Sequence, residues 1–343
     1  MIAMRKLGDT AVSRIGFGAG PIGGFRGPVD SVEAEAAMAA YLNAGGRYFD
    51  TSPLYGYGRS ELRVGAFLRE QTASAQPPAV ISTKIGRVFR VQRAGDDLST
   101  LRHGGLPFWP RFDYSYDGAM RSLEQSSLRT GLTRFDIVLV HDLEPGVHGA
   151  DFQRQFDTCM DGAYRALREL RDAGDILAIG VGVNQSEAAR AFVEAGDFDC
   201  VMLAGCYSLL DHDLAVLSFF ELCQDKGVGI LAAGVFNSGI LATGAGASAS
   251  YGYRPANPAI KQRVRAIQQV CAEFDVDLPA AAIQFVLAHP VVASVVLGSS
   301  SATNVQQNLA HAGKVLPTAF WRKLADAGLL PMHLTPEHGK PIC

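Results

Sequence analysis

The chain has 343 residues, of which 48% are hydrophobic, and its formal net charge is −3. It has no basic block and no acidic tail, which argues against nucleic acid or an anionic membrane as a partner. No apolar stretch approaches the roughly 18 residues of a membrane helix, and residues 1–16 lack the long apolar segment of a secretory signal. We expect a cytoplasmic globular protein, whose oligomeric state the sequence leaves open.

The six cysteines are scattered and form no CxxC pair. This spacing is not that of a zinc site, and a chain of this length rarely depends on a disulfide framework. We expect mostly buried thiols and no metal. The cysteines are Cys159, Cys200, Cys206, Cys223, Cys271 and Cys343.

Short runs rich in Val, Ile and Leu alternate with longer stretches of helical periodicity. Such continuous apolar runs are typical of strands that are buried on both faces of a parallel sheet. Eight of them follow one another along the chain. They cover residues 14–20, 47–51, 80–85, 135–142, 176–184, 200–205, 228–234 and 293–300.

Four of the intervening stretches predict helices from their apolar stripes and end signals. The first begins with Asp30 and Ser31 as candidate caps, and the second has a single apolar stripe that stops at Gly174. The four stretches cover residues 31–44, 158–173, 186–196 and 278–289.

Eight strands alternating with helices favour a closed (β/α)8 barrel, formed as a single domain by residues 1–343 with an N-terminal strand segment at 1–20. The alternative is a doubly wound sheet, which should carry a GxGxxG fingerprint after its first strand, and none occurs there. Three long loops, 86–114, 142–152 and 234–258, follow strands. In a barrel they therefore belong to the C-terminal face, where active sites form.

Four polar side chains stand at or just beyond the ends of neighbouring strands. Asp50 ends the second run, Tyr55 follows in the stretch FDTSPLYGYG, Lys84 lies in the third run and His141 ends the fourth. Singly, each has an ordinary explanation: a capping acid, a rim aromatic, a structural ion pair or a core histidine. Together on one barrel face, they indicate an active site.

The chemistry of this set is proton transfer beside a hydride acceptor. A tyrosine hydroxyl has a pKa of about 10, and a nearby lysine ammonium lowers that value. A carboxylate such as Asp50 holds the lysine in place, and a histidine orients the substrate oxygen by a hydrogen bond. Tyr55 is therefore the candidate general acid/base.

These motifs resemble the aldo/keto reductase family over nearly the whole chain. Asp50, Tyr55, Lys84 and His141 match its catalytic tetrad in order and in strand context. The resemblance implies a TIM barrel, a nicotinamide cofactor extended across the strand ends, and no metal. Tyr55 would transfer the proton, with Lys84 and Asp50 tuning it and His141 orienting the substrate.

Residues 112–118, 203–211 and 234–244 are similar to a narrower branch, the D-threo-aldose (L-fucose) 1-dehydrogenases and pyridoxal 4-dehydrogenases. That branch implies oxidation of a cyclic hemiacetal to a lactone. A general NADPH-dependent carbonyl reductase remains an alternative. The intact tetrad disfavours a nicotinamide-binding sensor, and the spacing of the histidines disfavours a metal-dependent hydrolase.

The resemblance also places the cofactor. Asn184 would bind the nicotinamide amide, although it could simply cap the next helix. Ala204 and Ala233 stand where many members have a glutamine and a stacking aromatic ring. The pyrophosphate loop would comprise Phe236, Asn237, Ser238 and Gly239, and the adenosine end Gly298, Ser299, Ser300, Ser301, Asn304, Gln307 and Asn308.

The segment 297–309 has no cation to meet a 2′-phosphate, whereas NADP-preferring relatives carry Lys or Arg there. We therefore expect NAD as the preferred cofactor, with NADP left open because Lys261 or Lys314 could supply charge from elsewhere. In the 86–114 loop, Phe108 and Trp109 are candidate substrate-pocket residues, although they could equally pack the loop onto the barrel.

Overall fold

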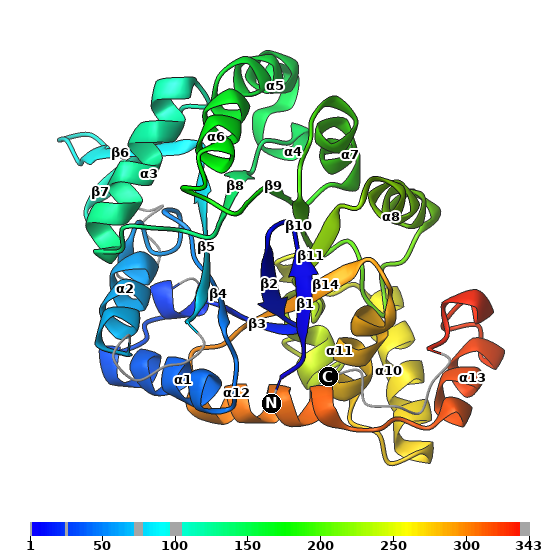
Figure 1. The fold of residues 1–343 in the computed structure, drawn as a ribbon. Coiled ribbons are helices and arrows are strands. Elements are labelled where there is room, and N and C mark those ends of the chain that lie inside the picture. The colour runs from blue at the N-terminus through cyan, green and yellow to red at the C-terminus, as the bar shows by residue number, and fades with distance from the viewer. Residues whose placement is uncertain (1, 25–26, 72–77, 97–104, 337–343) are drawn as a thin grey trace.

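A closed barrel of eight parallel strands, ringed by helices, forms the body of the protein (Figure 1). The computed structural model describes residues 2–24, 27–71, 78–96 and 105–336. All eight expected strands take part, so the (β/α)8 prediction is confirmed. In order around the barrel, they are β3 (Ile15–Gly18), β4 (Tyr48–Asp50), β5 (Val80–Ile85), β8 (Ile137–His141), β9 (Ala178–Val183), β10 (Cys200–Ala204), β11 (Gly229–Ala233) and β14 (Val292–Gly298).

The barrel closes where the last strand pairs with the first. β14 runs parallel to β3, with Val295 opposite Ile15 and Gly298 opposite Gly18. The buried Arg14 side chain reinforces this seam, because its Nη1 donates to the carbonyl of Val292 at 2.6 Å. Both strands are buried almost throughout, as their apolar sequences predict.

An antiparallel hairpin of β1 (Met4–Leu7) and β2 (Thr10–Ser13) covers the N-terminal end of the barrel. Its buried residues Leu7 and Val12 pack with interior residues such as Tyr48, Leu139 and Leu231. The N-terminal segment thus contains a hairpin before its barrel strand. This hairpin seals the floor of the barrel, and the opposite, C-terminal end holds the cleft described below.

The outer layer consists of helices that follow the strands. The Asp30 carboxylate caps the first helix as expected, accepting from the backbone N–H of Glu33 at 2.8 Å. The helices are α1 (Ser31–Asn43), α2 (Arg59–Gln71), α3 (Tyr116–Thr130), α7 (Ser186–Ala195), α8 (Leu214–Lys226), α10 (Pro258–Glu273), α11 (Leu278–Ala288), α12 (Ala302–Gly313) and α13 (Thr318–Asp326), with short 3₁₀ turns η1 (Pro21–Gly23) and η6 (Met332–Leu334).

The prediction of a single helix over residues 158–173 is wrong. Two helices, α5 (Phe152–Asp161) and α6 (Ala163–Asp172), meet at Gly162. Gly162 lies against the start of α3, where an added Cβ would be only 2.7 Å from the backbone nitrogen of Tyr116. The break therefore comes from a tertiary approach that helical periodicity does not encode.

The three long loops carry structure of their own beyond the ends of β5, β8 and β11. The first contains the hairpin β6 (Arg87–Val91) and β7 (Phe108–Phe112). The second contains α4 (Pro145–His148) and the turn η4 (Gly149–Asp151), and the third contains η5 (Asn237–Gly239), α9 (Ile240–Thr243), β12 (Ser250–Tyr251) and β13 (Arg254–Pro255).

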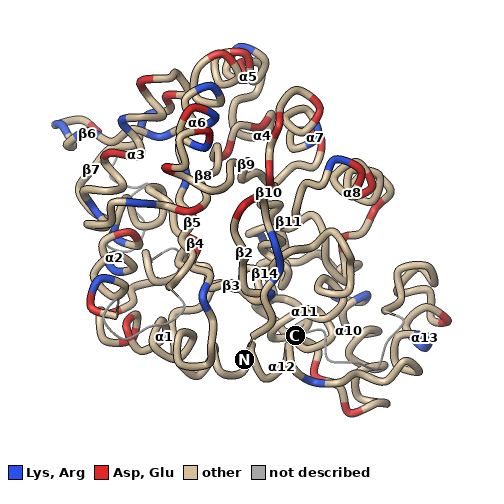
Figure 2. The backbone as a smooth tube through the Cα atoms, viewed as in Figure 1, with Lys and Arg blue, Asp and Glu red and all other residues tan. Residues whose placement is uncertain are grey.

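Acidic and basic residues are interspersed along the outer helices, including α2, α6 and α8 (Figure 2). Within the described ranges, no helix is both long and apolar enough to cross a membrane. Cys159, Cys200, Cys206, Cys223 and Cys271 are free thiols, and Cys343 lies outside the described residues. Among the residues that the structure describes, no group of three or more His, Cys, Asp or Glu side chains is placed to hold a metal ion.

Candidate active site

A cleft of about 870 Å³ opens at the C-terminal end of the barrel. The ends of all eight barrel strands, α12 and several segments that follow strands contribute residues to its walls. All four residues of the predicted tetrad, Asp50, Tyr55, Lys84 and His141, line it. The structure therefore brings together side chains that lie up to 91 positions apart in the chain.

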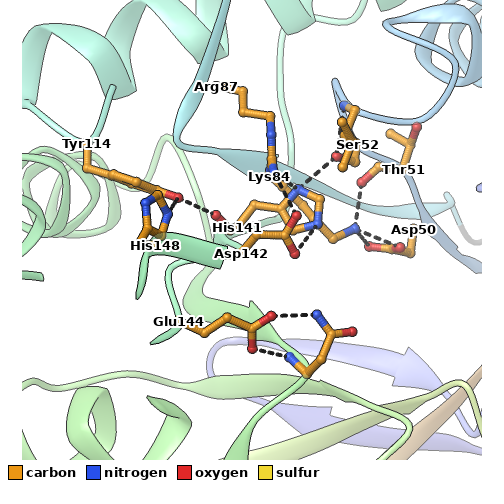
Figure 3. A network of polar contacts seen from close by, with 12 residues as sticks. Asp50, Thr51, Ser52, Lys84, Arg87, Tyr114, His141, Asp142, Glu144 and His148 are labelled. Atoms are coloured by element: carbon orange, nitrogen blue, oxygen red, sulfur yellow. Dashed lines mark hydrogen bonds and ion pairs between the residues drawn. The ribbon is translucent and has the colours of Figure 1, made fainter. Parts of the chain in front are cut away.

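Lys84 and Asp50 form a buried ion pair at the floor of the cleft (Figure 3). Lys84 Nζ donates to both carboxylate oxygens of Asp50 at 2.8 Å and to the carbonyl of Thr51 at 2.9 Å. Burial works against the charge of Lys84, but Asp50 and Tyr55 outweigh it and raise the pKa of the ammonium. Lys84 is therefore charged throughout the neutral range.

Tyr55 reaches the site from a tight turn between β4 and α2. Gly56 (φ 64°) and Gly58 (φ 98°) adopt the left-handed backbone that glycine tolerates best. The Tyr55 ring lies with its centroid 4.7 Å from Lys84 Nζ and meets the His141 ring edge-on at 6.2 Å. The turn thus sets the phenol between a cation and an imidazole.

Burial raises the pKa of Tyr55 to about 12, although the charge of Lys84 acts in the opposite direction. The effect of Lys84 is in the predicted direction, but the effect of burial is larger and was not predicted. The phenol of Tyr55 is consequently protonated at neutral pH in this cleft, and Lys84 limits how far its pKa rises.

His141 is a neutral imidazole, because burial lowers its pKa to about 3. Its Nδ1 faces two groups, Ser52 Oγ at 3.2 Å and Arg87 Nη1 at 3.3 Å. Its Nε2 lies 3.3 Å from Asp142 Oδ1. This ring can act as a hydrogen-bond donor to a substrate oxygen without carrying a charge.

Arg87 and Asp142 were missed in the sequence. Arg87 Nη2 donates to Asp142 Oδ2 at 2.8 Å, and both side chains are largely buried beside His141 (Figure 3). Asp142 also lines the cleft and has φ 52°, a backbone conformation that is unusual for a residue other than glycine and often found at functional sites. The signal for Asp142 was its place directly after β8, whereas Arg87, which follows Gly86 beyond the end of β5, carried none.

Glu144 orients Asn184. The Glu144 carboxylate accepts from the backbone N–H of Asn184 at 2.6 Å and from its Nδ2 at 2.7 Å. Asn184 lines the cleft, and the capping residue of α7 is Gln185 instead. With its amide nitrogen engaged by Glu144, Asn184 offers Oδ1 as a hydrogen-bond acceptor. Ala204 and Ala233 line the cleft as well.

Most of the predicted phosphate and adenosine residues line the cleft, namely Phe236, Ser238, Gly239, Gly298, Ser299, Ser300, Asn304, Gln307 and Asn308. On α12, the spacing of the last three continues to His311, which puts one helix face along the cleft. His311 was not predicted to lie there.

Two residues of that set do not line the cleft. The buried Asn237 donates through its amide to Asp211 and thereby ties the turn η5 to the segment between β10 and α8. The Ser301 hydroxyl caps α12, accepting from the N–H of Asn304 at 3.3 Å. Both residues therefore stabilise segments that contribute neighbouring residues to the cleft wall.

Phe108 and Trp109, the predicted substrate-pocket residues, lie on β7 and are not among the described residues of the cleft wall. The Phe108 ring packs on Phe89 at 6.4 Å, and Trp109 lies 5.9 Å from the guanidinium of Arg90. Both rings hold the β6–β7 hairpin together, because they sit on the strand that pairs with β6.

Sequence comparison settles the family. The model of the aldo/keto reductase family matches residues 14–328. This chain belongs to the aldo/keto reductase family. Its members are oxidoreductases that use nicotinamide cofactors. The cleft suits such a group, because small residues such as Gly18, Gly182 and Gly298 line it and the segment leading into the N-terminus of α12 forms part of its wall.

Two curated aldo/keto reductases match over nearly the full length of this chain. A pyridoxal 4-dehydrogenase from Microbacterium luteolum is 40% identical over 338 residues, which cover 95% of this chain and 97% of the relative. A D-threo-aldose 1-dehydrogenase from a Pseudomonas species is 36% identical over 326 residues, covering 94% and 95% respectively.

The fold agrees with that of a solved family member. The holo form of an aldo-keto reductase from Bacillus halodurans superimposes with a TM-score of 0.73 and 24% identity, over 97% of this chain and 100% of the other. This likeness supports the barrel architecture alone.

Proposed function

We propose that this enzyme oxidises a cyclic hemiacetal to a lactone with NAD, and that Tyr55 is its general acid/base. The observation that carries the proposal is the cluster of Tyr55, Lys84, Asp50 and His141 at the floor of one cleft. The two curated relatives support the substrate class, because their names denote dehydrogenases of pyridoxal and of an aldose. Both of those substrates form cyclic hemiacetals.

The proton follows a route through the tetrad. His141 donates from Nε2 to the oxygen of the anomeric hydroxyl and fixes its position. Tyr55 first releases its own proton to solvent, and its phenolate oxygen then takes the proton of that hydroxyl, while Lys84 stabilises the phenolate and Asp50 holds Lys84. The cofactor, when bound, supplies the acceptor for the hydride from the anomeric carbon. The hemiacetal thus loses a proton and a hydride and becomes a lactone.

The choice of NAD rests on charge. Among the described residues that line the cleft, Lys84 is the only Lys or Arg. Lys84 is paired with Asp50, and both residues are far from α12 in the sequence. The two lysines that could have supplied charge are engaged elsewhere: Lys261 donates to the carbonyl of Ala247, and Lys314 pairs with Asp277. A 2′-phosphate would lack the charge-assisted hydrogen bonds it needs.

Pyridoxal is the second candidate substrate, favoured by the 40% identity to the pyridoxal 4-dehydrogenase. The third candidate function is the reduction of carbonyl compounds with NADPH. It would use the same four residues for the reverse reaction. Cofactor preference separates it from the other two, because it requires a site for the 2′-phosphate.

The decisive assay follows reduced nicotinamide at 340 nm, with NAD and then NADP, on L-fucose, D-arabinose, galactose and pyridoxal in parallel. We expect NAD-dependent turnover of at least one of these. Equal kcat/KM for NADP would contradict the cofactor assignment, and activity only in the reductive direction would favour the carbonyl reductase.

The role of Tyr55 is tested by Tyr55→Phe. We expect turnover to fall at least about 100-fold, the range for loss of a general acid/base, with cofactor binding retained. The matched control is Tyr57→Phe, in the same turn and also partly buried, which should keep its activity. Turnover by Tyr55→Phe at the wild-type rate would refute the mechanism.

A further inference from the structure

We propose that Arg87 is a positioning residue for His141: its guanidinium keeps Nδ1 as a hydrogen-bond acceptor, so the single ring proton resides on Nε2, toward the substrate. This inference rests on the role proposed for His141 above. It also gives a function to the β6–β7 hairpin, whose first residue is Arg87.

The backbone places Arg87 beside the site by a tight turn at the end of β5. Gly86 has φ 107°, and a Cβ there would lie 2.3 Å from the ring of Tyr114, so the turn requires glycine. The side chain then runs back toward the end of β8, where His141 and Asp142 lie (Figure 3). Figure 3 shows its guanidinium next to the imidazole.

Three contacts immobilise the guanidinium. Nη1 lies 3.3 Å from His141 Nδ1, and Nη2 donates to Asp142 Oδ2 at 2.8 Å. The group also lies over the ring of Phe112, 4.4 Å from its centroid, and Phe112 is the direct cross-strand partner of Arg87 in the hairpin. The hairpin thus supplies both the cation and the surface on which it rests.

The contacts to the imidazole select one tautomer. Arginine has donors and no acceptor, so the nitrogen that faces Arg87 must present its lone pair. On the other side of the ring, Nε2 faces the Asp142 carboxylate at 3.3 Å, which accepts and cannot donate when ionised. The donor at Nδ1 therefore requires the Nε2–H form, since burial keeps the ring neutral, and the carboxylate near Nε2 is compatible with that form.

Ser52 alone would not make this selection. Its hydroxyl accepts from the N–H of Leu54 at 3.2 Å and can still either donate to or accept from Nδ1 of His141 at 3.2 Å. Without Arg87, the Nδ1–H tautomer would become accessible and would leave a lone pair on Nε2. That lone pair would repel the substrate oxygen instead of donating to it.

The groups that face His141 are consistent with this role. Arg87 and Lys84 disfavour a charged imidazole, and Asp142 favours one. Because Arg87 pairs with Asp142, it also offsets the carboxylate that would otherwise draw a second proton onto the ring. A substrate oxygen can then accept a hydrogen bond from Nε2.

The test reads the tautomer directly. The protein labelled with ¹⁵N-histidine gives two-bond ¹H–¹⁵N correlations that distinguish Nε2–H from Nδ1–H, and the signal of His141 is assigned among the eight histidines by its loss in His141→Gln. We expect Nε2–H in the wild-type protein. An Nδ1–H signal would overturn the proposal without any variant at Arg87.

Two variants complete the test. Arg87→Met should admit the Nδ1–H tautomer and lower kcat by about 100-fold or more, while KM for NAD stays within about twofold. Arg87→Lys, which restores a donor, should keep Nε2–H and recover at least about tenfold of that loss. The matched control is Arg90→Met, which removes another cation of β6, paired with Asp96 far from His141, and should leave kcat unchanged.

A purely structural role for Arg87 predicts a different pattern. Arg87→Met would then lower the melting temperature, with the His141 tautomer unchanged and kcat within about threefold of wild type. That result would overturn the proposal. The tautomer signal needs no substrate, so a failure of the proposed hemiacetal oxidation would leave it readable and the two failures remain distinguishable.

Discussion

The buried pair of Lys84 and Asp50 should be strongly coupled in stability. The two side chains are 1% and 3% exposed, and Lys84 Nζ makes three hydrogen bonds. Asp50→Asn would leave a buried ammonium with the Thr51 carbonyl as its main partner, and Lys84→Met would leave a buried carboxylate with Ser82. Removing one partner of a buried pair costs about 3–5 kcal/mol.

We therefore expect each single substitution to lower the free energy of unfolding by at least about 3 kcal/mol. The double variant Asp50→Asn/Lys84→Met should lose at least about 2 kcal/mol less stability than the sum of the two single variants, because no uncompensated charge remains. The assay is urea unfolding at pH 7, followed by both tryptophan fluorescence and far-UV circular dichroism, whose transitions must coincide. Single costs below about 1 kcal/mol that simply add would refute this reasoning.

Three further expectations concern other parts of the molecule. Asn304→Arg, on the cleft face of α12, should raise kcat/KM for NADP by about tenfold, whereas Thr303→Arg, exposed on the same helix and absent from the cleft wall, should not. Gly65→Ala should lower the free energy of unfolding by about 1–3 kcal/mol in urea titrations, because its Cβ would lie 2.0 Å from the carbonyl oxygen of Thr130. Burial lowers the pKa of His289 to about 4, so its contribution to stability is complete above about pH 6.5 and is lost as the pH falls toward 4, since the unfolded chain binds the proton first. His289→Leu should therefore gain stability relative to wild type over that interval, and a constant difference would contradict the assignment.

The barrel could be predicted from the sequence because each of its strands is a short apolar run bounded by turn residues. Val80–Ile85 forms β5 with the predicted bounds. Asp50, Lys84 and His141 lie on one face of the barrel, because parallel strands end at the same edge. The pattern of apolar residues in a strand depends on that segment alone, so it can be recognised without knowing which segments pack against it. The apolar pattern predicted most accurately the positions of residues at strand ends, because strand direction alone places them on one face.

What the sequence could not supply depends on contacts between distant segments. The break at Gly162 arises from α3, and the position of Phe108 and Trp109 arises from the pairing of β7 with β6. Arg87 belongs to no sequence motif, because its role depends on a contact with His141, which is 54 positions away. Likewise, the raised pKa of Tyr55 comes from burial, which a residue pattern does not quantify.

The seam between β3 and β14 has a consequence for synthesis on the ribosome. Arg14 and its partner Val292 are 278 positions apart, so the first barrel strand emerges long before its neighbour is translated. Until then, one edge of β3 lacks its partner strand, a state in which exposed edges favour aggregation. Gly18 and Gly298, which face each other across this seam, both line the cleft. A nascent chain therefore completes the cleft only when nearly the whole protein has been made.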